Sequence, residues 1–407
     1  MTKERQLGLI TILLPFLVQG CIEPFEPETV DFESRLVVEA NITNESKNQL
    51  VKISRTFALD TTGVYAEENA KVQVMVNDES TYDFKDQGNG TYVSQTAFSA
   101  KAGLGYRLLF TTKDGDEYIS EEEIAPEPTK IHRIYAERGF KDGGANEGMF
   151  IYLDSYDPTG INKYYRYEYE ETYKIIAPFW NALDLYIRNP LPALEVALRP
   201  KEREERICFG TNVSKAIIQQ NITNFKETRI SGFPVRFINK ENYILSYRYS
   251  NLIKQHVQTA EAYAYYRALN DLASNGSIFS QIQTGFLEGN IRSKENQDRL
   301  VIGFFEVSSI SQKRLFFNYA DFFPDEELPN YIGECVFYPI DPRANAYFMS
   351  YAIETAGHKY YGTGDGAEND VRPTDGDTGA EFLMVSRICG DCTILGSNVV
   401  PNFWEEE

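Results

Sequence analysis

Residues 71–93 read KVQVMVNDESTYDFKDQGNGTYV, and this stretch decides the fold class. Valine occupies every second position from residue 72 to residue 76, which is the period of a half-buried β-strand. Asn77-Asp78 and Gly88-Asn89-Gly90 then supply turns, because Asn, Asp and Gly accept positive φ angles. The stretch therefore predicts short strands joined by tight turns.

The same pattern extends in both directions. Further short strands are expected at 36–42, 49–56, 81–84, 91–93 and 106–111. About seven short strands over about 90 residues are typical of an immunoglobulin-like sandwich. We therefore predict an N-terminal immunoglobulin-like β-sandwich over residues 35–125, which ends where Pro126 and Pro128 interrupt the ladder.

Residues 130–407 are expected to form a larger β-rich domain. The clearest helix of the chain begins at Thr259, an N-cap residue, and ends by Gly276. The chain is therefore predicted to be mainly β, with one helix packed on the sheet of the second domain. The apolar face of that helix would hold Ala262, Tyr266, Leu269 and Ala273. Strand-like patterns recur at 131–136, 149–156, 164–176, 235–238, 243–257 and 300–308.

The N-terminus has the layout of a bacterial secretory signal, assigned to residues 1–20. Its apolar run from 7 to 18 is too short to span a bilayer. Cys21 follows a small residue, as in a lipobox, so Cys21 is expected to be acylated and to anchor the mature chain in a membrane. The alternative is an ordinary secreted protein with an odd cysteine. In the lipid-anchored protein, residues 21–34 would form an acidic, proline-rich tether.

The four remaining cysteines are expected to form two disulfides, because their number is even and the predicted compartment is oxidising. They are Cys208, Cys335, Cys389 and Cys392. Four cysteines allow three connectivities, and spacing does not choose among them. A redox or zinc role for the Cys389-Gly390-Asp391-Cys392 motif is the alternative, but neither a helix start nor a nearby histidine supports it.

Charge and motif content argue against several function classes. The chain carries 40 Lys plus Arg against 60 Asp plus Glu, a net charge of −20 that would repel a phosphate backbone, so no nucleic-acid partner is expected. A serine nucleophile elbow, a phosphate-binding glycine loop and a metalloprotease histidine pair are all missing from the sequence. We therefore expect no enzyme, although 60 acidic residues leave a carboxylate-based glycosidase open.

Two stretches stand out as candidate binding elements. The segment 362–381 combines glycines with acidic residues, and its oxygen ligands on a loop would suit Ca²⁺, with an exposed acidic loop as the alternative. The strand at 164–176 places tyrosines on one face, and the loop at 177–181 carries a tryptophan beside a proline. These aromatics would contact a ligand or partner, or else pack in the core. The calcium candidates are Asp365, Asp370, Asp375 and Asp377, and the contact candidates are Tyr165, Tyr167, Tyr169 and Trp180.

Several short motifs together resemble one known family. They lie at 35–43, 70–74, 90–92, 250–266, 289–305 and 389–404. The family is a Bacteroidota outer-membrane lipoprotein family catalogued as a domain of unknown function, and its genes commonly lie beside SusC-like TonB-dependent transporters. The resemblance implies an outer-membrane lipoprotein. The acidic residues directly behind Cys21 resemble the signal that sends such lipoproteins to the cell surface, with a charged linker as the alternative.

The resemblance also implies a function, although it brings no catalytic residues. We expect a non-enzymatic surface lipoprotein that associates with a SusC-like TonB-dependent outer-membrane transporter and helps to capture or admit a nutrient. The alternative is a structural accessory subunit of an outer-membrane protein assembly or secretion complex. Both expectations rest on the gene neighbourhoods of the family, which is an associational warrant.

Overall fold

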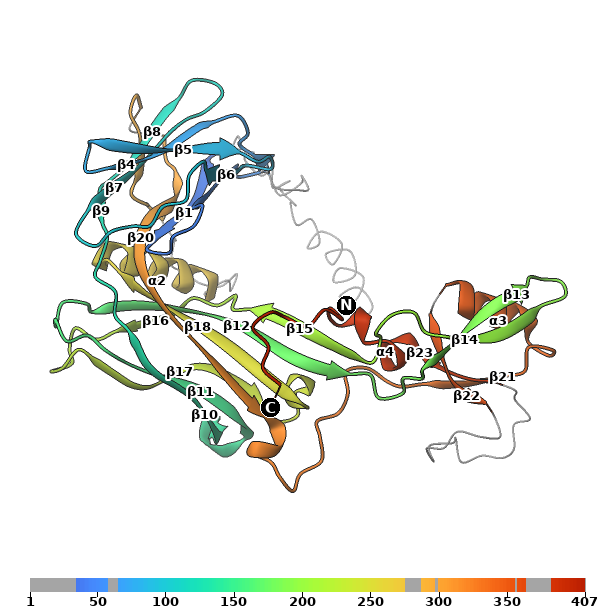
Figure 1. Cartoon of the computed structure of the whole chain (residues 1–407). Helices are drawn as coiled ribbons and strands as arrows, with labels where there is room; N and C mark the ends of the chain where they lie inside the picture. Colours follow the sequence, from blue (N-terminus) through green and yellow to red (C-terminus); the bar gives the residue numbers. More distant parts are fainter. Residues whose placement is uncertain are drawn as a thin grey trace, which may run out of the picture.

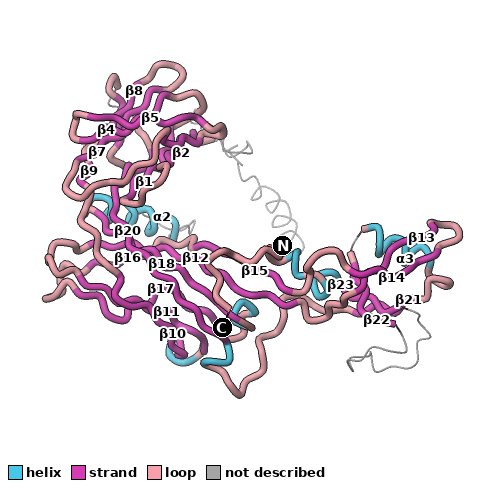
Figure 2. Tube along the Cα trace, in the orientation of Figure 1, coloured by secondary structure: helices cyan, strands magenta, loops and turns pink. Residues whose placement is uncertain are grey.

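A computed structural model describes residues 34–57, 65–274, 287–296, 299–355, 357–363 and 382–406. The chain is mainly β, as predicted. Its strands form three lobes, here called the N-terminal, central and distal lobes, and Figures 1 and 2 show them arranged in a bent row with the central lobe in the middle.

The N-terminal lobe is a sheet wrapped around one apolar core. Its strands are β1 (Leu36–Thr43), β2 (Leu50–Arg55), β3 (Tyr65–Ala66), β4 (Lys71–Val76), β5 (Ser80–Asp86), β6 (Thr91–Ser94), β7 (Gly105–Thr111), β8 (Glu117–Ser120) and β9 (Glu123–Ile124). The hydrogen-bonded order β1-β2-β6-β5-β4-β7-β8 is continuous. In β4, Val72, Val74 and Val76 all point into the core, as their alternation predicts. Asn77 and Asp78 both have positive φ in the β4–β5 turn, as expected.

The central lobe is a two-layer sandwich. One layer is the sheet β10-β11-β17 and the other contains β15-β12-β18-β20, and residues from both layers share a single core. The strands are β10 (Ile131–Lys141), β11 (Asn146–Tyr156), β12 (Tyr164–Ile176), β15 (Ile207–Val213), β16 (Ile218–Asn221), β17 (Arg229–Asn239), β18 (Arg248–Gln258) and β20 (Ile302–Asn318). Short 3-10 turns lie at Asp142–Gly144, Tyr243–Leu245 and Tyr319–Asp321.

Strand β20 belongs to both lobes. Its first half pairs with β1 in parallel, from Val37↔Ile302 to Thr43↔Ser308, and its second half pairs with β18 antiparallel. Gly303 is required at this junction, because its φ is +129° and a Cβ there would lie 2.0 Å from the carbonyl oxygen of Val38. The short β19 (Ile291–Ser293) likewise pairs with β8. Residues 291–293 and 302–308 therefore complete the N-terminal lobe, so the predicted boundaries 35–125 and 130–407 miss this return of the chain.

Helix α2 (Ala260–Ser274) packs where the two lobes meet, as Figure 1 shows. The hydroxyl of Thr259 accepts a hydrogen bond from the Ala262 backbone N–H at 3.2 Å, which confirms the predicted cap. The predicted apolar face is only partly correct. Ala262 is buried as predicted and Tyr265 is buried against Phe304 of β20, whereas Leu269 is 36% exposed.

The distal lobe is a small β-sheet unit with two helices. Its elements are β13 (Leu183–Asn189), β14 (Glu195–Pro200), β21 (Phe337–Ile340), α3 (Ala346–Glu354), β22 (His358–Thr363), β23 (Phe382–Ser386), α4 (Arg387–Gly390) and a 3-10 turn at Cys392–Ile394. The charge-rich stretch 199–206 lies here and is mostly exposed, but one of its carboxylates is buried. Glu205 is 3% exposed and accepts from Lys201 at 2.6 Å and from Lys359 at 3.1 Å, since the opposite charges compensate one another's burial.

All four remaining cysteines form disulfides, as predicted. Cys208 of β15 pairs with Cys392, and Cys335 pairs with Cys389 of α4. The first disulfide ties the central lobe to the C-terminal segment of the chain, and the second closes the base of the distal lobe. The two cysteines of the Cys389-Gly390-Asp391-Cys392 motif therefore go to different partners.

Candidate functional site: a charged cleft between two lobes

Two groups of predicted site residues lie outside the described residues. These are the lipidation candidate Cys21 and the calcium candidates Asp365, Asp370, Asp375 and Asp377. Within the described part of the chain, no cluster of three His, Cys, Asp or Glu side chains could hold a metal ion. No helix among the described residues combines the length and apolarity that crossing a membrane requires.

The tyrosine face of β12 is a core face. Tyr165 and Tyr167 are both 0% exposed and pack in the central core, so as placed they offer no surface to a ligand or partner. Tyr169 is half-buried, with the Arg236 guanidinium 5.4 Å from its ring centre. Trp180 is also half-buried, with Arg206 at 5.8 Å. The strand period explains this outcome, because one face of a sandwich strand must fill the core.

The opposite face of β12 lines a cleft between the N-terminal and central lobes. One cavity of about 690 Å³ and a second of about 520 Å³ adjoin there. They share six lining residues, which are Glu39, Arg166, Glu168, Ile217, Lys254 and Tyr266. A volume of this size suits a small-molecule ligand.

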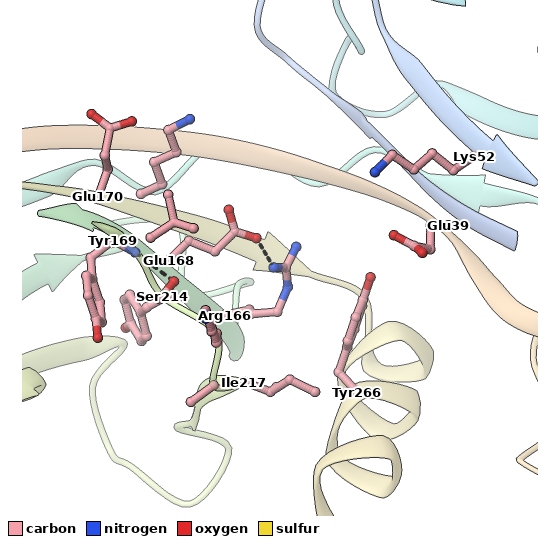
Figure 3. A pocket seen from close by; sticks show the side chains of 14 residues that line it. Glu39, Lys52, Arg166, Glu168, Tyr169, Glu170, Ser214, Ile217 and Tyr266 are labelled. Carbon is pink, nitrogen blue, oxygen red and sulfur yellow. Dashed lines mark hydrogen bonds and ion pairs between the residues drawn. The ribbon is translucent and has the colours of Figure 1, made fainter. Parts of the chain in front are cut away.

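The two walls of the cleft come from different lobes. Glu39 of β1 and Lys52 of β2 form the N-terminal wall, and Arg166 and Glu168 of β12 belong to the central wall. Figure 3 shows the first pair facing the second across the cleft, with Tyr266 of α2 standing beside them. Lys254 of β18 completes the central wall. Strand β20, which pairs with both lobes, helps to hold the two walls in place.

A buried polar network lies beneath the central wall. The Arg166 guanidinium donates from Nη1 to Glu168 and from Nη2 to Glu306 Oε2 at 3.0 Å. Gln258 donates to the other oxygen of Glu306 at 2.6 Å. Arg166 and Glu306 are 7% and 0% exposed. Burial alone would lower the pKa of Arg166, but the carboxylate charges of Glu306 and Glu168 raise it above its ordinary value.

His256 of β18 extends this network. Its Nδ1 lies 3.1 Å from the Ser308 hydroxyl, which donates to Asn41 Oδ1 at 3.0 Å. Its Nε2 lies 3.5 Å from Glu168 Oε2. Burial and the adjacent Arg166 charge lower the pKa of His256, so the imidazole is held neutral.

The order Ser308–His256–Glu168 has the residue types of a hydrolase triad, but the geometry does not favour catalysis. Ser308 is 0% exposed and does not line the cleft, so a substrate could not reach its hydroxyl. The Arg166 guanidinium, 3.4 Å from His256 Nδ1, also opposes the imidazolium that a general base must form. These groups are therefore suited to fixing the position of Arg166 and Glu168 in the wall.

Glu123 is a second unusual carboxyl group near the junction. It is 5% exposed, accepts from Thr259 at 3.0 Å and lies 3.3 Å from the Asn290 amide. Burial, assisted by the charge of Glu306, raises the pKa of Glu123 to about 8. The carboxyl group is therefore protonated at neutral pH and joins the helix N-cap to the N-terminal lobe.

The sequence predicts a contact strand at 164–176, and two of its candidates, Tyr167 and Tyr169, line the larger cavity, but it does not predict a role for the charged face of that strand. The signal was present, because Arg166, Glu168 and Glu170 alternate with the tyrosines along β12. Three successive charged residues on one face of a strand indicate a solvent-facing or ligand-facing surface. Glu306, the partner of Arg166, and Ser308, the partner of His256, carry no comparable signal, because the tertiary pairing of β20 brings them to the junction.

Comparison with known proteins places the chain in a family without assigning an activity. No curated protein matches the chain. A family described as a domain of unknown function matches residues 22–314, which is more than half of the chain. That stretch contains all six residues shared by the two cavities and ends inside β20. The chain belongs to the family named Domain of unknown function (DUF4249).

Proposed function

We propose that this protein is a non-enzymatic, lipid-anchored surface protein that associates with a SusC-like TonB-dependent outer-membrane transporter and helps to capture a nutrient. Cys21 would carry the lipid, and the acidic tether behind it would let the folded lobes sit clear of the membrane surface. Capture requires a cavity that is open to solvent and has fixed binding groups, whereas turnover would require a nucleophile or an acid–base pair within reach of a substrate.

The cleft is the observation that carries the proposal. It measures about 690 Å³ in its larger part, and its walls come from two lobes that share one strand. The polar network of Arg166, Glu306 and His256 fixes the central wall from behind. Such a rigid, charged recess between lobes supports a binding role.

Copurification tests the partner. Full-length protein would be extracted from its native outer membrane in mild detergent and captured, with the Cys21→Ala variant as the control, and the bound proteins identified by mass spectrometry. We expect a TonB-dependent barrel with the wild type and its loss with the variant. Recovery of outer-membrane assembly machinery instead would favour the accessory-subunit alternative. Recovery of no barrel would overturn both.

A further inference from the structure

Each wall of the cleft carries a Glu–Lys pair in direct register. Glu39 lies opposite Lys52 in the β1–β2 ladder, and Glu168 lies opposite Lys254 in the β12–β18 ladder. Opposite charges at such positions are close enough to form an ion pair. Neither pair does so at 4 Å or less among the described residues. Figure 3 shows Lys52 and Glu39 extending toward the space in front of Arg166 and Glu168.

The acidic residues of the cleft are largely neutralised by other cations. Glu168 shares Arg166 with the buried Glu306, Glu170 pairs with Arg314 at 3.1 Å, and Glu45 pairs with Lys47. Three lysines that line the cleft make no ion pair in the described part of the chain: Lys52, Lys215 and Lys254. Among the lining carboxylates of the described residues, Glu39 alone is also without an ion pair. A chain of net charge −20 thus places a surplus of unpaired cations in one recess. Such a recess concentrates anions.

Two buried polar side chains belong to the same walls. Arg166 is 7% exposed and its Nε has no hydrogen-bond partner, and His256 is 2% exposed with its Nε2 3.5 Å from Glu168 Oε2. Both side chains line the cleft. Both atoms are enclosed by protein, so a ligand in the cleft would meet the wall beside them rather than these atoms.

The remaining lining adds one apolar surface and one acceptor. Tyr266 of α2 stands beside Arg166, with the guanidinium 4.8 Å from its ring centre, and borders both cavities. A carbon skeleton would pack against this ring. The Glu39 carboxylate would accept a hydrogen bond from a hydroxyl group of the same ligand. These features favour an organic ligand with hydroxyl groups over a simple inorganic ion.

We propose that the cleft binds a small hydroxylated organic anion whose carboxylate or phosphate group lies between Lys52 and Lys254, with Lys215 at the edge. This assignment rests on the binding role proposed above and names the chemical class of its ligand. Carboxylate and phosphate share the oxyanion chemistry that lysine recognises, so the test treats them as separate arms.

Isothermal titration calorimetry on the purified, acylated full-length protein tests the assignment. The probes are citrate for the carboxylate arm, glucose 6-phosphate for the phosphate arm and maltotriose as the neutral comparison, all at low and equal ionic strength. We expect saturable binding of at least one anionic probe and none of maltotriose. Equal binding of maltotriose, or binding of neither anion, would overturn the assignment.

Matched variants locate the binding. The double variant Lys52→Gln/Lys254→Gln should weaken binding of the anionic probe by about tenfold or more, because two charge-assisted contacts are lost. The double variant Lys71→Gln/Lys85→Gln removes two exposed lysines of the N-terminal lobe that do not line the cleft and should bind as the wild type does. Unchanged binding by the first double variant would contradict the assignment.

The calorimetry and the copurification can overturn the ligand proposal and the partner proposal independently of each other. The calorimetry uses the isolated protein and needs no transporter, whereas the copurification needs no ligand. A barrel recovered without anion binding would overturn only the ligand class. Anion binding without a barrel would leave the cleft assignment standing and overturn the proposed partner.

Discussion

Arg166 Nη2 lies 3.0 Å from Glu306 Oε2 at the junction of the N-terminal and central lobes, where the two side chains are only 9% and 0% exposed. The contact joins β12 of the central sheet to the segment of β20 that pairs with β1. One ion pair therefore lies at the point where the lobes meet and directly behind the cleft wall. Its integrity should govern both stability and the position of the wall.

Replacing Glu306 tests this relationship. Glu306→Gln leaves the Arg166 charge buried without its carboxylate partner and should lower the free energy of unfolding by about 3–5 kcal/mol. Glu121→Gln is the matched control, because Glu121 pairs with Arg292 where both side chains are 59% exposed, and it should cost less than about 1 kcal/mol. Urea denaturation measures both values. Similar losses in the two variants would contradict the structural role of the buried pair.

Glu123 should make stability depend on pH. Its pKa of about 8 in the folded state exceeds the ordinary value of 4.5, so the folded chain holds a proton that the unfolded chain releases. This contribution is fully present below about pH 4.5 and is lost as the pH rises through about 8. Glu123→Gln cannot ionise, so its stability should fall less than that of the wild type between about pH 5 and about pH 9, by a few kcal/mol.

Thermal unfolding across that pH range provides the comparison for Glu123. Glu121→Gln, an exposed neighbour on the same segment, should retain the slope of the wild type. An identical pH slope in Glu123→Gln and the wild type would show that the carboxyl group is not buried as described.

The two buried tyrosines of β12 should respond differently to loss of the hydroxyl group. Tyr167 has a buried hydroxyl with no hydrogen-bond partner, so Tyr167→Phe should leave stability within about 0.5 kcal/mol of the wild type or raise it. The Tyr165 hydroxyl lies 3.3 Å from both Thr129 Oγ1 and the Asn162 carbonyl oxygen, so Tyr165→Phe should cost about 0.5–1.5 kcal/mol. Denaturant titration of both variants measures the two changes in the free energy of unfolding. A larger loss for Tyr167→Phe would contradict the described core.

The two disulfides should contribute unequally to stability. Cys208–Cys392 spans 184 residues and Cys335–Cys389 spans 54. Loop-closure entropy grows with the logarithm of loop length, so removing the longer link should cost about 1 kcal/mol more. The variants Cys208→Ser/Cys392→Ser and Cys335→Ser/Cys389→Ser would be compared by urea denaturation under oxidising conditions. A greater loss from the shorter link would argue that native contacts, not chain entropy, dominate.

Local pattern predicted the strands well because their burial alternates. Residues 71–76 form β4 over the same residues that the valine alternation indicates, and the positive φ of Asn77 follows from its turn position. The N-cap at Thr259 was predictable for the same reason, because a cap depends on residues within one turn. Such features require no knowledge of distant partners.

The junction could not be predicted from local pattern, because it depends on pairing between distant segments. Val37 pairs with Ile302, and no periodicity in either segment specifies a parallel partner so far along the chain. This pairing brings Phe304 against Tyr265, which is not on the predicted apolar face of helix α2, and brings Glu306 to Arg166. The same pairing holds the N-terminal lobe beside the charged residues of β12, so local pattern does not predict the cleft.

Copurification from the native outer membrane tests the central claim most directly. The proposal predicts that the wild-type lipoprotein recovers a TonB-dependent barrel in near-stoichiometric amount and that Cys21→Ala does not. Recovery of no barrel by the wild type, or equal recovery by the soluble Cys21→Ala variant and by an unrelated lipoprotein, would contradict it.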